Sequence, residues 1–138
     1  MDEERQRDLH AAVELYNRGK YLESQEAFEG IHVRCAADEQ PLVRSLAMVA
    51  CAMHLHFHRG GGRGALNLLR QSLILLEDLR PTRDGVRTDV LYDSLYAYVQ
   101  DLQERAARAA RGKGAAGGRA GATFLDRWLA PRIPLERR

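Results

Sequence analysis

The hydrophobic positions along this chain recur at the spacing of a helix face. They lie three, four or seven residues apart on both sides of the stretch NRGK, so the sequence predicts two helices there. Gly19 is expected between them, because glycine readily takes the left-handed conformation that ends many helices. Asp2 is placed to cap the first helix. We expect Tyr16, Tyr21 and Phe28 to pack in the core.

Three more helices are predicted further along. Pro41 suits the first turn of a helix that is apolar nearly all round, which is typical of a central helix. The stretch RGGGRG ends it, and after Gly64 a fourth helix starts with Ala65 on its buried face. A fifth runs from about residue 88 to residue 111. No strand pattern is found, so the predicted fold class is all-α: a compact bundle of about five helices built from two helical hairpins.

The chain divides into three parts on this reading. Residues 1–111 form the helical bundle. Residues 112–122, GKGAAGGRAGA, have nothing to bury and are predicted to be a flexible linker. Residues 123–138 start with a short amphipathic helix that is predicted to dock on the body of this chain or on a partner subunit. Its predicted docking residues are Phe124, Leu125, Trp128 and Leu129.

Several motif blocks resemble a known family. They are LYNRGKYLESQEAFE, HFHRGGGRGALNLL and GVRTDVLYDSL, in that order. Over roughly residues 8–102 the chain is similar to the bacterial and plastid family called domain of unknown function 309. The resemblance implies an all-helical fold and no established activity. It favours His56 as a retained histidine that faces Glu26 or Glu29.

The chain departs from that family at three positions. Gln25 stands where the family has a histidine, His32 where it has a tryptophan, and Arg87 where it has an aspartate. If the family site were a metal or acid–base centre that uses the first histidine, this chain has lost or altered it.

Carboxylates and histidines supply the candidate chemistry. The candidate catalytic residues are Glu26, Glu29 and His56. Glu29 and His32 have the Glu-x-x-His spacing of di-metal bundles, and His54 and His58 share a helix face at a spacing that zinc can use. The candidate metal ligands are therefore Glu29, His32, His54 and His58. The alternative is that all of these are polar residues at packing seams and helix ends, and no cofactor is predicted.

Charge divides the chain as well. The formal net charge is +2, but residues 1–104 carry −5 and residues 105–138 carry +7. A basic tail on an acidic body indicates either an anionic partner such as RNA or a tail that folds back. No aromatic residue is interleaved for base stacking among the basic residues at the start of the tail, which are Arg105, Arg108, Arg111, Lys113 and Arg119.

Other classes find little support in the sequence. No apolar run approaches the roughly 18 residues that span a bilayer. The start, MDEERQRDLH, is too acidic and polar for a signal or transit peptide. Cys35 and Cys51 form no CxxC motif and are interpreted as reduced thiols. These observations predict a cytoplasmic protein, with the plastid stroma as the alternative.

Three hypotheses for the function follow. The first is a non-enzymatic interaction module whose groove between hairpins takes a protein partner's segment, or which associates with itself. The second is a metal-dependent or acid–base enzyme of the hydrolase type that uses the Glu26, Glu29 and His56 cluster. The third is an RNA-associated factor anchored by the basic tail.

Overall fold

The computed structural model describes residues 1–60, 62–112 and 129–137, and this part of the chain is all-α. The predicted fold class is confirmed. The described residues contain no strand, only two isolated β-bridges. The helices, in chain order, are α1 (Glu3–Asn17), α2 (Tyr21–His32), α3 (Gln40–His58), α4 (Gly62–Glu77) and α5 (Thr88–Arg111).

Local signals in the sequence set the first hairpin. The Asp2 side chain accepts a hydrogen bond from the N–H of Arg5 at 2.8 Å and so caps α1. Gly19 has a φ of 81°, the left-handed conformation expected between α1 and α2. The N–H of Lys20 then donates to the carbonyl of Leu15 at 3.0 Å, which satisfies one of the last carbonyls of α1.

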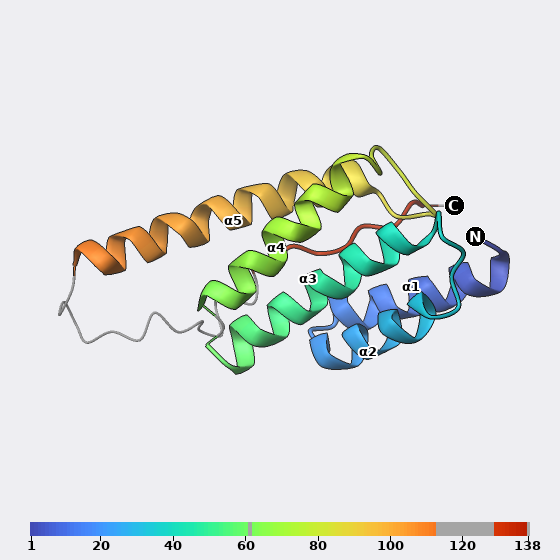
Figure 1. Cartoon of the computed structure of the whole chain (residues 1–138), viewed down its shortest axis with the longest axis horizontal. Coiled ribbons are helices and arrows are strands. Elements are labelled where there is room, and N and C mark those ends of the chain that lie inside the picture. Colours follow the sequence, from blue (N-terminus) through green and yellow to red (C-terminus); the bar gives the residue numbers. More distant parts are fainter. Residues whose placement is uncertain (61, 113–128, 138) are drawn as a thin grey trace.

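Helix α3 is the centre of the bundle. Each helix packs against the next in chain order, so α3 lies between α2 and α4 and contacts both (Figure 1). This position explains why its sequence is apolar on nearly every side. Its buried side chains are Leu42, Val43, Ser45, Leu46, Val49, Ala50, Ala52 and Met53.

Aromatic side chains fill the space between the first hairpin and α3. Tyr16, Tyr21 and Phe28 are all buried. The Tyr21 ring stacks on Phe57 of α3, with 5.8 Å between the centroids, and meets the edge of Tyr16 at 5.1 Å. Each large apolar side chain buried in this way contributes roughly 1.5–3 kcal/mol.

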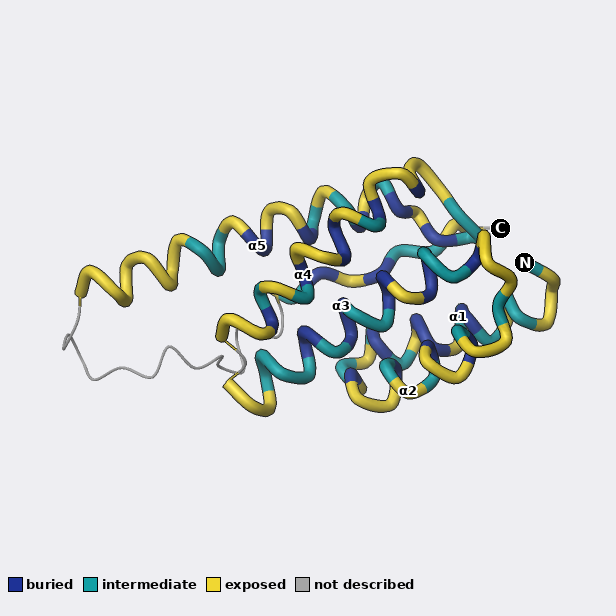
Figure 2. Tube along the Cα trace, in the orientation of Figure 1, coloured by how far each residue is buried: buried dark blue, intermediate teal, exposed yellow. Residues whose placement is uncertain are grey.

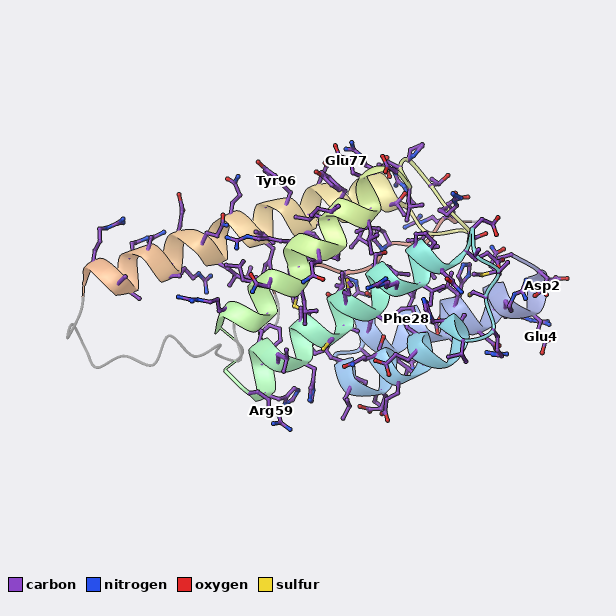
Figure 3. All side chains as sticks on the ribbon, viewed as in Figure 1. Asp2, Glu4, Phe28, Arg59, Glu77 and Tyr96 are labelled. Carbon is purple, nitrogen blue, oxygen red and sulfur yellow. The ribbon has the colours of Figure 1, made fainter. Side chains whose placement is uncertain are left out.

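Helix α5 extends past the rest of the molecule. Its buried residues end at Val99, and every residue from Glu104 to Gly112 is exposed (Figures 1 and 2). Tyr96 and Glu77 point outward from α5 and α4, away from the other helices (Figure 3). The predicted linker, apart from Gly112, lies outside the described residues.

In the second hairpin, the observed start of α4 lies close to the predicted one. Helix α4 begins at Gly62, within the glycine-rich stretch, rather than at Ala65, and Ala65 is buried. Gly64 lies in the first turn, where an added Cβ would meet open space. Among the described helices, none is both long and apolar enough to cross a membrane.

Candidate functional site

The predicted cluster of two glutamates and a histidine is not gathered into a metal site. Glu26 and Glu29 are exposed on α2, and Glu29 accepts a hydrogen bond from Gln25 at 2.9 Å. The His56 ring meets the edge of Tyr98 on α5, with 6.2 Å between the centroids. Within the described ranges, no three His, Cys, Asp or Glu side chains are grouped to hold a metal ion.

The other candidate metal ligands, His32, His54 and His58, are half-buried or exposed, and they lie near the ends of two different helices. The rings of His54 and His58 do lie together on one face of α3, with 5.1 Å between centroids, as the i, i+4 spacing requires. His58 is exposed at the end of α3, and His32 is half-buried at the end of α2. A pair of imidazoles with no third grouped ligand does not make a structural zinc site.

The two cysteines, Cys35 and Cys51, are free thiols. Burial raises the pKa of Cys35, and burial together with the Glu29 carboxylate raises the pKa of Cys51. Because the thiolate is the nucleophilic form, a raised pKa opposes nucleophilic catalysis at neutral pH.

Charge on the projecting part of α5 is locally balanced. Arg105 pairs with Asp101 at 3.0 Å, and Arg108 pairs with Glu104 at 3.5 Å, both one helical turn apart. These carboxylates reduce the positive potential that a phosphate backbone would require.

The described C-terminal residues contain an extended segment that the sequence analysis did not predict. We call residues 131–136 the strap and the surface beneath it the strap groove. The strap is extended rather than helical, and it runs across the bundle between α1 and the loop that joins α4 to α5 (Figure 1). Its docking on this chain brings together residues more than 100 positions apart in the sequence.

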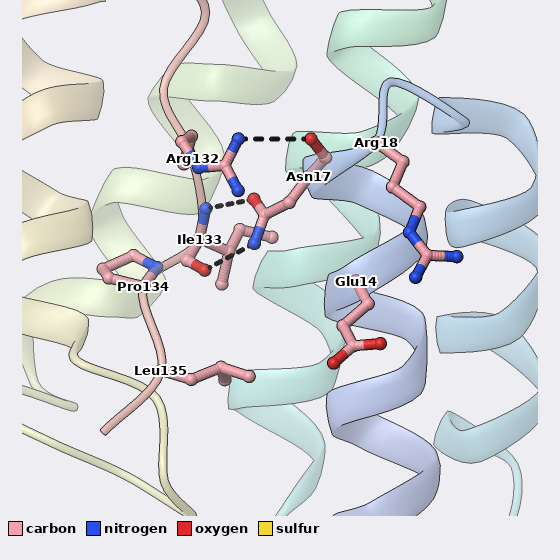
Figure 4. A pocket seen from close by; sticks show the side chains of 7 residues that line it. All are labelled: Glu14, Asn17, Arg18, Arg132, Ile133, Pro134 and Leu135. Carbon is pink, nitrogen blue, oxygen red and sulfur yellow. Dashed lines mark hydrogen bonds between the residues drawn. The ribbon is translucent and has the colours of Figure 1, made fainter. Parts of the chain in front are cut away.

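The end of α1 binds the first half of the strap. The Tyr16 hydroxyl donates to the carbonyl of Pro131 at 2.7 Å. The Asn17 amide makes two bonds to Ile133: its Nδ2 donates to the carbonyl at 3.0 Å, and its Oδ1 accepts from the N–H at 2.9 Å (Figure 4). Arg132 donates to the carbonyl of Asn17 at 3.4 Å, where a cation suits the negative end of the helix.

The loop between α4 and α5 binds the second half. The N–H of Arg87 donates to the carbonyl of Pro134 at 2.9 Å, and the N–H of Glu136 donates to the carbonyl of Gly85 at 2.7 Å. Val86 and Leu135 form an antiparallel β-bridge between these two contacts. The strap therefore pairs with this loop as a short strand would.

Alternate side chains of the strap face the core. Pro131 is buried, Ile133 is 1% exposed, and Leu135 packs against the core, whereas Arg132 and Glu136 are exposed. Alternation with a period of two is that of an extended strand. Main-chain hydrogen bonds and alternating apolar side chains together hold the strap in its groove.

Burial also fixes the state of the Tyr16 hydroxyl. It raises the pKa of Tyr16 well above the ordinary value, and neighbouring Tyr21 and Tyr98 raise it further. The hydroxyl therefore stays protonated across the physiological range and donates to the strap throughout it.

A surface pocket of about 460 Å³ lies between α1 and the strap (Figure 4). Its residues from α1 are Glu14, Asn17 and Arg18, and those from the strap are Arg132, Ile133, Pro134 and Leu135. The strap therefore provides one wall, so this pocket has its shape only while the strap is docked.

The residues that were predicted to dock precede the strap in the sequence. Phe124, Leu125 and Trp128 lie outside the described residues. Leu129 is 64% exposed. The signal for the strap was present in the alternation of Pro131, Ile133 and Leu135, but it covers only a few positions.

Comparison with models of known protein families and with curated proteins finds no match to this chain.

Proposed function

We propose that this chain is a non-enzymatic interaction module whose strap groove binds an extended segment of a partner protein. One observation carries the proposal: the groove already holds an extended segment, and it does so largely through that segment's main chain. Side chains and backbone of the body contact main-chain atoms of Pro131, Ile133, Pro134 and Glu136. Recognition of this kind, with pockets for alternate side chains, is how folded domains bind extended peptides.

Other observations fit the same proposal. The pKa values of both cysteines are raised, and the part of the chain that the structure describes contains no group of three His, Cys, Asp or Glu side chains that could hold a metal ion. These observations lend no support to the enzyme hypothesis. The motif blocks that resemble domain of unknown function 309 imply an all-helical fold, as this chain has. That family has no established activity. The two free thiols suit the cytoplasm or the plastid stroma.

A peptide offered to a chain whose strap has been released tests the proposal. Ile133→Asp in the full chain puts a carboxylate into an apolar site and should free the groove. A labelled peptide of residues 129–137 should then bind saturably, measured by fluorescence anisotropy. Asn17→Ala in the same background is the matched control, and it should weaken binding about tenfold because it removes two hydrogen bonds to Ile133.

A folded Ile133→Asp chain, with the helicity of the wild type by circular dichroism, that binds no peptide contradicts the proposal. If Ile133→Asp does not fold, the milder Ile133→Ala takes its place, because it shortens the side chain without burying a charge.

A further inference from the structure

The two prolines of the strap stand where the groove uses no N–H. Pro131 and Pro134 contribute carbonyls, which accept from the Tyr16 hydroxyl and the Arg87 N–H. The N–H groups that the groove does use belong to Ile133 and Glu136. Proline lacks an N–H, so it is tolerated at the first pair of positions and excluded at the second.

Side chains add a second set of requirements. The Ile133 side chain is fully enclosed, so this position demands an apolar residue of similar size. Leu135 packs against the core from a half-buried position. Arg132 lies at the C-terminal end of α1, on the carbonyl of Asn17, and lines the same pocket as Glu14. A basic residue is favoured there by the negative end of the helix dipole.

From these contacts we propose that the strap groove selects partner segments with a basic residue followed by isoleucine or valine and, two positions later, leucine, that it accepts proline on both sides of the first two, and that the chain's own strap competes with such segments. The inference rests on the proposed function and specifies its ligand. The occupant is a protein segment of the strap's own chemistry, because that is the chemistry that the groove contacts. Proline also preorganises such a segment, since it restricts the free peptide to extended conformations before binding.

Competition follows from the covalent link between strap and body. A tethered segment has an effective concentration of the order of millimolar at its own site. A free peptide must therefore displace the strap in the wild-type chain. Its apparent affinity equals its intrinsic affinity multiplied by the small fraction of molecules whose groove is free. The docked strap therefore acts as an intramolecular competitor that weakens the binding of other segments.

A panel of peptides tests the pattern on the full-length Ile133→Asp chain. The wild-type peptide of residues 129–137 is the reference. A peptide with Ile133→Pro should bind at least about tenfold more weakly, because the groove loses the N–H that Asn17 accepts. A peptide with Pro134→Ala keeps every hydrogen bond and should stay within about fivefold of the reference. Arg132→Glu should weaken binding several-fold, and less so at high salt.

The wild-type chain supplies the second measurement. It should bind the reference peptide at least about tenfold more weakly than the Ile133→Asp chain does. Unlabelled peptide added to the wild-type chain should accelerate hydrogen exchange at the Ile133 amide, and this readout does not depend on any variant folding.

The outcomes separate the two proposals. If the reference peptide binds but Ile133→Pro binds equally well, the pattern is overturned and the proposed function stands. If the wild-type chain binds the peptide as tightly as the variant does, competition by the strap is overturned. If a folded Ile133→Asp chain binds no peptide of the panel, the proposed function itself fails.

Discussion

Asn17 is the residue on which the docking of the strap depends most directly. A side-chain amide offers one donor and one acceptor group, which match the carbonyl and the N–H of a single extended residue. Ile133 is that residue, and both of its main-chain groups bond to the amide. Because these groups are enclosed with the buried Ile133 side chain, loss of the amide leaves them without their bonds.

Asn17→Ala should lower the free energy of unfolding by about 1–3 kcal/mol, the cost of leaving buried polar groups unsatisfied. Urea denaturation followed by circular dichroism measures it. Glu14→Ala, on the same helix and lining the same pocket but exposed, is the control and should change stability by no more than about 0.5 kcal/mol. Equal effects of the two substitutions would contradict this role for the amide.

The environment of Glu39 links the stability of the fold to acid pH. A hydrogen bond from the N–H of Ala36 lowers the pKa of Glu39, and the Met1 ammonium and Arg5 lower it further. A carboxyl whose folded pKa lies below its unfolded pKa stabilises the protein above the unfolded value. That stabilisation is lost as the pH falls through the folded pKa.

Glu39→Gln should therefore be less stable than the wild type at pH 7, and the difference should shrink as the pH falls through the lowered folded pKa of Glu39, because the wild-type carboxylate is then protonated too. Urea unfolding at a series of pH values measures it. A difference that stays constant over this range would show that the loss comes from packing and not from ionisation.

At the scale of the element, much of the fold could be predicted from local signals. Asp2, Gly19 and Pro41 set helix ends by rules that act within one turn, and the structure has those ends where the rules put them. The facing of α3 could not be predicted, because a helix that is apolar on nearly every side does not indicate which neighbour each residue meets. His56, for example, was expected to face α2, and one contact of its ring is with Tyr98 on α5, which the pattern did not indicate.

The docking of the strap could not be predicted from the sequence, for a different physical reason. Its partners are Tyr16, Asn17 and the residues 85–87, all far away in the sequence. Its own pattern is only three alternating apolar positions, too few to distinguish a strand from irregular chain. Docking depends on tertiary contacts that no local rule contains.

The two halves of helix α5 should contribute unequally to the free energy of unfolding. Leu95 is fully buried, so Leu95→Ala should cost about 2–5 kcal/mol in the free energy of unfolding. Ala107 lies on the exposed projection, and Ala107→Gly should reduce helicity there with a cost of at most about 1 kcal/mol. Urea unfolding measures both. A large loss of stability from Ala107→Gly would contradict this division, because it would mean that the exposed projection stabilises the fold through contacts of its own.

At the scale of the whole molecule, the strap joins the end of the chain to its beginning and to the α4–α5 loop. Bonds from α1 and from this loop hold its two halves, so the strap should dock as one unit. Elements that dock as a unit are coupled energetically: once one contact is lost and the unit detaches, loss of the others costs little more.

A double-mutant cycle measures that coupling. Asn17→Ala and Ile133→Ala should each be destabilising, and the double variant should be less destabilised than their sum by about 0.5–3 kcal/mol. Ser72→Ala is the control partner for Asn17→Ala: its hydroxyl donates to Leu69 within α4 and shares no hydrogen-bond partner with the strap, so those two effects should add to within about 0.5 kcal/mol. Additive losses for Asn17→Ala and Ile133→Ala would mean that the strap stays docked when either contact is removed. The groove would then hold its occupant through independent contacts, and a partner segment would have to displace the strap one residue at a time.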